Sequence, residues 1–221
     1  MAIIAELTPV AGTNTVAPIV LTAGTNLSTP AAGAFEYDGT VFYITPVASG
    51  RAVNAGIIFT SNQSGSFTMA NSSSAQSPFA AANDVLTVPA STTYIMEGLV
   101  QITGMGATTR TTALEFDAGT ATLTSISYLG EIWTGAATTI PTATGQKHCV
   151  AATAQVLNAT VATAAATIRW QGLVRINAAG TFIPQVKFSA DPTGTIVCSV
   201  DSYCTLIPLG SKTVASVGNW A

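Results

Sequence analysis

Residues 92–103 read TTYIMEGLVQIT, and residues 167–176 read TIRWQGLVRI. In both stretches apolar residues or glycine occupy every second position, and polar residues such as Glu97, Gln101 and Arg169 fall between them. Successive side chains of a β-strand point to opposite faces, so this period of two predicts strands with one buried and one wetter face. We therefore expect long half-buried strands to form the basis of the fold.

The same signal recurs along the chain from about residue 56. Short runs rich in β-branched and aromatic residues alternate with Gly, Pro, Ser, Asn and Asp, which favour turns. The strands that we expect are Ile57–Thr60, Ser66–Met69, Val85–Val88, Thr92–Thr103, Thr111–Phe116, Ala121–Ile132, His148–Gln155, Thr167–Ile176, Phe182–Phe188, Thr195–Val200 and Cys204–Leu209. Many strands at short spacing are typical of a sandwich or barrel. We predict an all-β fold: a jelly-roll-like antiparallel β-sandwich with an extended N-terminal arm.

Two segments do not fit this strand pattern. Asn71–Ala82 is rich in Ser and Ala and contains a proline, which predicts a surface loop. Ala151–Ala166 is rich in Ala and Thr, and its β-branched residues argue against a helix. We expect a loop and a strand there.

Residues 34–43 read AFEYDGTVFY. Asp-Gly between aromatic and β-branched residues is a strong hairpin signal, so a turn is expected at Asp38. The four aromatic rings within these ten residues predict a local core rather than a ligand site.

Residues 1–33 differ from the rest of the chain, because they contain three prolines and no aromatic residue. The sequence AGTN occurs at residues 11–14 and again at 23–26, and Gly-Thr-Asn favours turns. Two interpretations stay open: an arm that reaches a neighbouring subunit or host surface, or two short edge strands. We divide the chain into residues 1–33 and a β-sandwich domain of residues 34–221.

The chain carries only seven basic and ten acidic residues in 221, so 8% are charged where a soluble domain has about 25%. The low number of basic residues and their scatter argue against a nucleic-acid partner. The apolar runs are far shorter than the ~20 residues that a membrane span needs. The composition also excludes a disordered tail and a helical bundle. The start of the chain lacks the features of a secretory signal, so we expect a soluble protein made in a cytoplasm.

We expect no catalytic, cofactor-binding or metal site and no enzymatic activity. His148 is the single histidine, and its neighbour Cys149 would point to the opposite face of a strand, which argues against a Cys–His pair. Glu115 and Asp117 would share a strand face, where they could bind a cation or flank a sugar. The simpler interpretation is a solvated strand edge before a turn, and glycan cleavage stays a remote alternative.

The other acidic residues have structural interpretations. Asp38, Asp84 and Asp191 stand next to turn-forming residues, so we interpret them as turn residues. Two arginines on one strand, Arg169 and Arg175, could pair with Glu97 or Glu131. Such surface pairs contribute little stability, but at an interface they would fix the register.

The three cysteines are too few for a disulfide scaffold. Cys198 and Cys204 flank a turn-like sequence, and a three-residue hairpin loop would place them opposite each other. We expect two buried thiols, with a bridge as the alternative, and Cys149 unpaired. Trp170 is expected in the core, and Trp220 suggests that the C-terminal end is tucked against the body or a neighbouring chain.

Several of these stretches resemble sequences of tailed-bacteriophage proteins. Residues 34–39 with Phe42 and Tyr43 resemble a motif that recurs in tail-fibre-like and virion proteins. The last fifty residues resemble the same group more fully, at GLVRINAAGTFIPQV (172–186), IPLGS (207–211) and SVGNW (216–220). The resemblance covers about a third of the chain and carries no catalytic motif. It implies a β-rich structural protein of a phage particle.

These observations lead to one functional hypothesis and one alternative. We expect a virion structural protein, a homotrimeric capsid decoration (cement) protein that binds the major capsid protein on the capsid exterior. It would be assembled in the bacterial host cytoplasm. The alternative is a tail fibre or receptor-binding protein that adheres to host glycans. Because edge strands without Lys are poorly protected and interface cores lack charge, the composition predicts a subunit whose surface is largely covered.

Overall fold

The computed structural model describes residues 12–13, 17, 19–29, 31–39, 41–47, 50–54, 56–81, 84–117, 119–135 and 143–213. This part of the chain contains strands and turns but no helix, which confirms the all-β prediction. The strands are β1 (Phe35–Tyr37), β2 (Phe42–Val47), β3 (Gly50–Asn54), β4 (Ile58–Ser61), β5 (Phe67–Thr68), β6 (Leu86–Val88), β7 (Thr92–Met105), β8 (Thr112–Asp117), β9 (Thr122–Thr134), β10 (Ala143–Cys149), β11 (Gln155–Val156), β12 (Ala166–Ala178), β13 (Gly180–Phe188), β14 (Gly194–Cys198) and β15 (Tyr203–Ser211).

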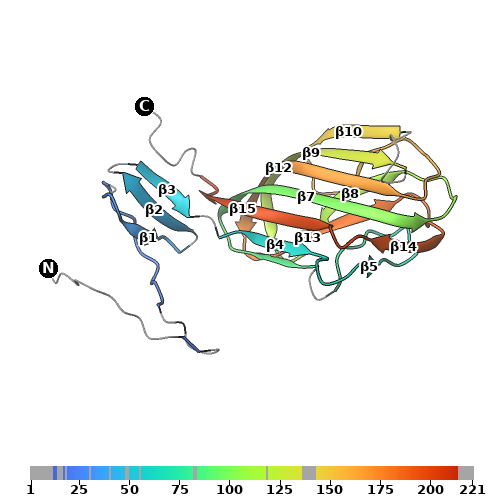
Figure 1. The fold of residues 1–221 in the computed structure, drawn as a ribbon. Helices are drawn as coiled ribbons and strands as arrows, with labels where there is room; N and C mark the ends of the chain where they lie inside the picture. The colour runs from blue at the N-terminus through green and yellow to red at the C-terminus, as the bar shows by residue number, and fades with distance from the viewer. Residues whose placement is uncertain are drawn as a thin grey trace.

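The strands form three sheets, and all their pairings are antiparallel (Figure 1). A small sheet has the order β1-β2-β3. A large eight-stranded sheet follows the path β10-β9-β12-β7-β14-β5, and its strand β15 pairs with both β7 and β4. A four-stranded sheet has the order β11-β8-β13-β6.

The long strand β7 is the centre of the large sheet. On one side, residues 93–102 pair continuously with β12. On the other side, β15 pairs with the first part of β7, and β14 pairs with its last residues. The alternating stretch that dominates the sequence therefore lies where both of its edges are hydrogen bonded.

The large and four-stranded sheets share one hydrophobic core. Phe116 of β8 stacks on Phe182 of β13, with ring centroids 5.3 Å apart. Phe116 also meets the edge of Tyr128 at 5.1 Å and of Trp170 at 5.9 Å, which come from β9 and β12. The inward residues of the alternating strands thus fill the space between two layers, as the period of two predicts.

Trp170, predicted in the core, is fully buried. It stands opposite Gly98 of β7 and Gly130 of β9 in the strand register. A methyl group added at Gly98 would lie 2.1 Å from Cζ2 of the indole. The ring therefore occupies the space that a larger residue at position 98 would need.

Most of the predicted strands are confirmed to within a few residues. The prediction of one strand over His148–Gln155 is wrong, because β10 ends at Cys149 and β11 begins at Gln155. The first residues of β10 and all of β3 were not predicted. Residues 143–147 (ATGQK) show no apolar alternation, and β10 pairs with β9 alone, at the edge of the sheet.

Both segments without strand periodicity are confirmed as mainly irregular. Among the described residues of Asn71–Ala82 there is no strand, although Gln76 forms an isolated bridge with Val186. Residues 150–165 are loop apart from the two-residue strand β11 and a bridge at Val161, and β12 follows.

The expectation that Cys198 and Cys204 lie opposite each other is wrong. Cys198 of β14 pairs with Ile102, and Cys204 of β15 pairs with Gly98, because the two strands lie end to end along β7. All three cysteines are free and buried, as expected for thiols. Burial raises the pKa of Cys198 to about 12 and also raises the pKa of Cys204.

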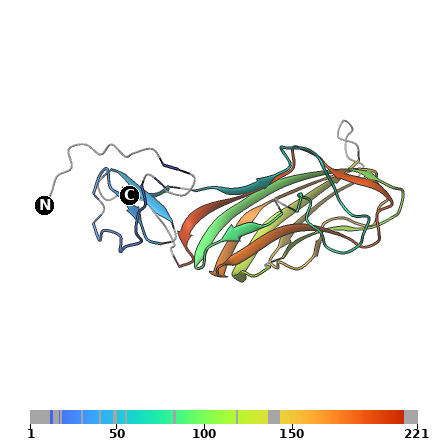
Figure 2. The same cartoon turned by 90° about the horizontal axis from the view of Figure 1, so that it is seen from below.

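The small sheet lies beside one end of the two-layered body (Figures 1 and 2). Within the described residues its strands pair only with one another, and β3 comes close to β15. The predicted division between residues 33 and 34 stays a prediction. The small sheet falls on the C-terminal side of that division.

Candidate binding surface

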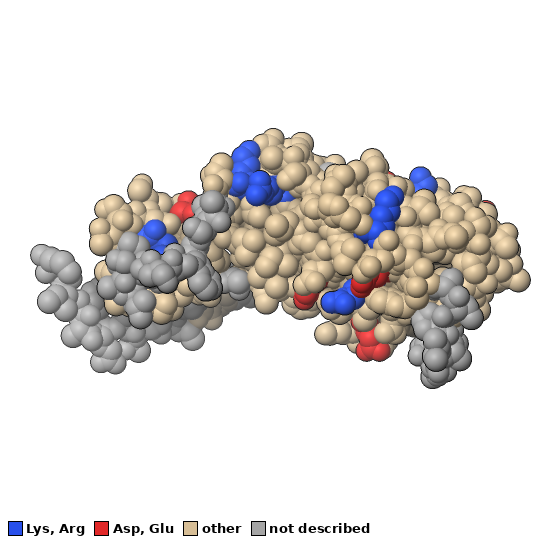
Figure 3. All heavy atoms as spheres, turned by 90° about the horizontal axis from the view of Figure 1, so that it is seen from above, with Lys and Arg blue, Asp and Glu red and all other residues tan. Residues whose placement is uncertain are grey.

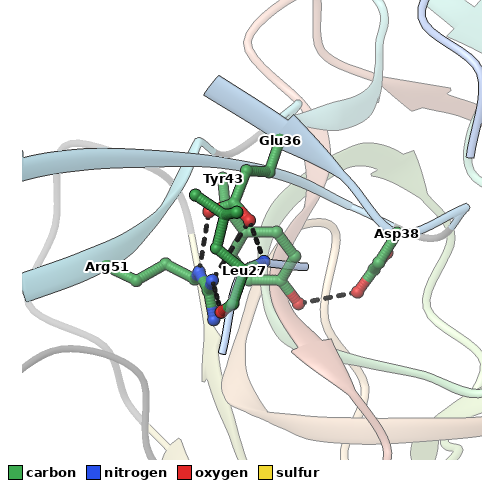
Figure 4. Close-up of polar contacts among 5 residues, drawn as sticks. All are labelled: Leu27, Glu36, Asp38, Tyr43 and Arg51. Carbon is green, nitrogen blue, oxygen red and sulfur yellow. Dashed lines mark hydrogen bonds and ion pairs between the residues drawn. The ribbon is translucent and has the colours of Figure 1, made fainter. Parts of the chain in front are cut away.

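The hairpin predicted at residues 34–43 is confirmed. Gly39 has a positive φ of 93°, and Tyr37 stands opposite Phe42 in the register. Asp38 acts as the expected turn residue, because its Oδ1 accepts a hydrogen bond of 2.9 Å from the Val41 amide. Its Oδ2 accepts a second bond of 2.9 Å from the Tyr43 hydroxyl (Figure 4).

A polar cluster of Leu27, Glu36 and Arg51 joins the N-terminal segment to the small sheet (Figure 4). Arg51 donates from Nε and Nη2 to the two Glu36 carboxylate oxygens, at 3.0 and 3.1 Å. Nη2 also donates to the Leu27 carbonyl at 2.6 Å, and the Leu27 amide donates to Glu36 Oε1 at 2.6 Å. A bidentate Arg–carboxylate pair has a fixed geometry, so the Leu27–Glu36–Arg51 cluster holds residue 27 against β1 and β3.

The electrostatics of this cluster favour its ionised form. The bond from the Leu27 amide, together with the Arg51 guanidinium, lowers the pKa of Glu36 below 4.5. Arg51 also lies over the Tyr43 ring, 5.8 Å from its centroid. Burial and the bond to Asp38 raise the pKa of Tyr43 to about 12. Tyr43 therefore stays a neutral hydrogen-bond donor on the covered side of the sheet.

The opposite side of the small sheet is apolar and exposed. Phe35 stands opposite Ile44, and Tyr37 opposite Phe42, so alternation places these four side chains on one face. The Phe42 ring stacks on Phe35 at 5.6 Å and on Tyr37 at 4.5 Å. Phe35 is 51% exposed, Ile44 45% and Phe42 38%. We call Phe35, Tyr37, Phe42 and Ile44 the aromatic face.

The prediction of a local core at these aromatic residues is wrong for three of the four rings. Only Tyr43 is buried, whereas Phe35 and Phe42 are exposed and Tyr37 is partly exposed. The physical reason is that, among the residues that the structure describes, the three-stranded sheet is covered on one side only. A cavity of about 400 Å³ adjoins the face, between residues 21–27 and β1, and Phe35 and Tyr37 contribute to its lining.

Glu115 and Asp117 lie on the same side of β8, as predicted, with Phe116 pointing into the core between them. Asp117 Oδ1 accepts a bond of 2.8 Å from the Gly119 amide. Asp117 is exposed at the end of β8, as the interpretation of a solvated strand edge predicts. Glu115 does not fit that interpretation, because it is only partly exposed and its Oε2 is buried. No group of three or more metal-ligating side chains occurs within the described residues.

His148 and Cys149 point to opposite faces of β10, as predicted. Cys149 is buried and its thiol pKa is raised by burial, whereas His148 is exposed and its Nε2 lies 3.0 Å from Ser127 Oγ. A Cys–His nucleophile pair would need both side chains on one face. These two residues therefore do not form one.

One of the predicted arginine–glutamate pairs forms. Arg169 lies 3.7 Å from Glu131, which neighbours it in the register. Arg175 and Glu97 are not brought together, because Arg175 stands opposite Thr93, four residues from Glu97 on β7.

Three further residues singled out in the sequence are Asp191, Asp84 and Trp220. Asp191 accepts a bond of 2.6 Å from the Ser73 amide and so joins two loops. Asp84 is in a bend, and Trp220 lies outside the described residues.

Arg110 is a buried residue that the sequence reasoning missed. Its guanidinium donates to the carbonyl oxygens of Thr108 at 2.6 Å, Gly106 at 3.3 Å and Thr163 at 2.7 Å. It also lies 5.7 Å from the centroid of the Phe188 ring. Burial lowers its pKa. Arg110 thus ties two loops together without an acidic partner among the described residues, an arrangement for which the sequence holds no local signal.

Charged side chains are few and scattered on the face drawn in Figure 3. Exposed large apolar side chains are correspondingly numerous, including several on β4, β9, β12 and β15. Among the described residues no helix has the length and apolar character that a membrane crossing requires.

Comparisons with models of protein families, with curated proteins and with solved structures found no match to this chain.

Proposed function

We propose that this chain is a virion structural protein of a tailed bacteriophage. In this proposal it is a non-enzymatic capsid decoration (cement) protein, which sits on the capsid exterior as a homotrimer and bridges capsid subunits. The observation that carries the proposal is the aromatic face, a group of exposed rings held in place by the Leu27–Glu36–Arg51 cluster. The sequence resemblance supports the assignment to a phage particle.

The chemistry of the aromatic face suits adhesion. Exposed contiguous apolar patches mark interaction sites, and aromatic residues contribute most strongly when they are buried in an interface. Phe35 and Phe42 expose large ring surfaces on a sheet whose other side is held by Tyr43, Asp38 and Arg51. Such rings lose little conformational freedom on binding, because stacking already restricts them. We infer that the major capsid protein covers this face.

A jelly-roll-like sandwich is also part of the proposal. Between β7 and β8, and again at each step from β11 to β14, the chain passes from one of the two larger sheets to the other. Repeated crossing between two antiparallel sheets is a property of jelly rolls and Greek-key sandwiches.

The proposal is tested by co-sedimentation of purified protein with phage shells that lack decoration. The wild-type protein is expected to pellet with the shells. The double variant Phe35→Ser/Phe42→Ser is expected to bind at least tenfold more weakly, because it removes the two exposed phenylalanine rings of the aromatic face. Val150→Ser is the matched control, since Val150 is 68% exposed and follows β10 on the body. Equal binding by the double variant would overturn the role of the aromatic face.

Deletion of residues 1–30 provides a second test, because it removes Leu27 and its bonds to Glu36 and Arg51. We expect loss of shell binding with the thermal unfolding of the body unchanged. Unaltered attachment of the truncated protein would refute a role for this segment. The tail-fibre alternative would be supported if the protein did not pellet with shells but bound host glycans or competed with phage adsorption.

A further inference from the structure

The large sheet has an outer face that nothing in the described chain covers. Its inner face packs on the four-stranded sheet, with Met96, Val100 and Val174 fully buried. The residues between them point outward by alternation. They include exposed or partly exposed apolar side chains, notably Leu173, which is 40% exposed. On this mixed face, polar side chains such as Glu97 and Arg169 surround exposed apolar ones. Apolar side chains that gather on an exposed face mark a contact site.

An apolar row crosses the middle of this outer face. Leu173 of β12 stands opposite Ile95 of β7, and Ile95 stands opposite Ile207 of β15. Each of these positions lies between inward residues, so all three side chains share the outer face. We call Leu173, Ile95 and Ile207 the apolar row.

Two opposite charges flank the apolar row at equal distances. Glu97 lies two residues from Ile95 along β7, and Arg175 lies two residues from Leu173 along β12, on the other side of the row. The two charges are therefore about 13 Å apart along the strands. Neither takes part in an ion pair within the residues that the structure describes.

We infer that this face binds the same face of a second copy of the chain. In this contact a two-fold axis runs along the apolar row, across the strands. It places the partner's outer face against this one, with the strands of the partner running in the opposite direction. Glu97 of each copy then faces Arg175 of the other, and the apolar row packs on its own counterpart. Such an isologous contact forms two equivalent Glu97–Arg175 ion pairs, one on each side of the axis. A self-complementary surface of this kind is typical of two-fold dimers.

The charge balance favours a second copy over a strongly charged partner. On β9, β12, β7 and β15 the charged residues are Glu131, Arg169, Arg175 and Glu97, two of each sign. Glu131 and Arg169 already pair with each other, which leaves one acid and one base for the contact.

The size of the face is also suitable. Through the apolar row run β9, β12, β7 and β15, which make a surface about 19 Å wide, and eight residues along the strands give about 26 Å. This footprint of about 500 Å² per partner lies at the lower end for specific interfaces, which suits a reversible contact.

The test is sedimentation velocity of the full chain over a range of concentrations. We expect a reversible two-fold association of the wild type. Because a two-fold contact cannot close a ring of three, it is seen as a dimer of single chains or, where the proposed homotrimer forms, as a hexamer of two trimers. Glu97→Arg and Arg175→Glu are each expected to raise the dissociation constant at least tenfold, because each places like charges opposite each other. An equimolar mixture of the two variants is expected to associate again, since each variant supplies the charge that the other lacks. This rescue also shows that both variants fold.

Lys187→Glu is the matched control, because Lys187 is exposed on β13, in the four-stranded sheet. It is expected to associate like the wild type. A monomer at all concentrations, a trimer whose mass neither reversal changes, or a mixture that fails to associate would each overturn the inference. The inference does not rest on capsid attachment, which the shell assay tests separately with variants in the aromatic face.

Discussion

Substitution of Gly98 by alanine probes the packing on which the two-layered core depends. The added methyl group would lie 2.1 Å from Trp170 Cζ2 and 2.5 Å from both Cε2 and Cη2. Contacts this short require the indole or the backbone of β7 to move. The indole is fully buried and meets Phe116 at 5.9 Å, so it has little space to move into.

The expected cost can be stated from these contacts. Overpacking a core costs about 1–3 kcal/mol, and the rigid neighbours place Gly98→Ala at the upper end, about 3 kcal/mol. For a chain of this length that loss corresponds to a fall in Tm of about 6–12 °C. The measurement is urea unfolding followed by tryptophan fluorescence, with thermal unfolding by circular dichroism as the second method.

Gly130→Ala is the matched control, because Gly130 flanks the same tryptophan on the opposite strand. A methyl group there would lie 2.8 Å from Leu157 Cδ2, at the end of a flexible side chain, and in ordinary contact with Tyr128 Cε2 at 3.5 Å. We expect a loss below about 1.5 kcal/mol. In a double-mutant cycle with Trp170→Leu, the Gly98→Ala cost should shrink by at least about 1 kcal/mol. A Gly98→Ala protein as stable as wild type, or strictly additive losses, would refute the reasoning.

Arg110→Ala is expected to lower the free energy of unfolding by about 3 kcal/mol, because it removes a buried donor to three carbonyl oxygens; a loss below about 1 kcal/mol in urea titrations would contradict this. Burial raises the pKa values of Cys198 and Tyr94 to about 12, so the unfolded chain releases these protons first. Stability should be complete below pH 9 and fall towards pH 12, and urea midpoints that stay constant over this range would disprove it. The lowered pKa of Glu36 means that its bond to the Leu27 amide is present above pH 4.5 and lost as the pH falls through the folded value. The protection of the Leu27 amide from hydrogen exchange, relative to the intrinsic rate at each pH, should fall accordingly, and Glu36→Gln should show lower protection already at neutral pH.

Much of the fold could be predicted because its strands alternate. In the stretches around Met96 and Trp170, the alternation predicts that every second side chain is buried. The structure confirms that these side chains are buried. The hairpin at Asp38 could be predicted because an Asp-Gly pair between β-forming residues strongly favours a hairpin turn. The edge residues 143–147 could not, since a strand with little apolar content has no periodic signal.

The candidate surfaces were harder to predict than the strands. The sequence shows that Phe35 and Phe42 lie close together, but their exposure depends on whether a second layer covers β1–β3. The same limit applies to the Cys198–Cys204 arrangement, which depends on two strands sharing one long neighbour. The strand register decides which charged residues are neighbours. It places Arg169 within ion-pair distance of Glu131, whereas Arg175 and Glu97 are four residues apart along the strands.

The sharing of β7 by distant strands has a consequence for the order in which the protein can fold. β15, which begins at Tyr203, pairs with β7 and with β4, which begins at Ile58. Neither earlier strand can complete its hydrogen bonds until β15 has been synthesised. Contacts of such large sequence separation make folding slow and leave strand edges open in the nascent chain. We therefore expect the body to fold only after β15 has been synthesised, with the unfinished edges of β4 and β7 as the points most exposed to aggregation.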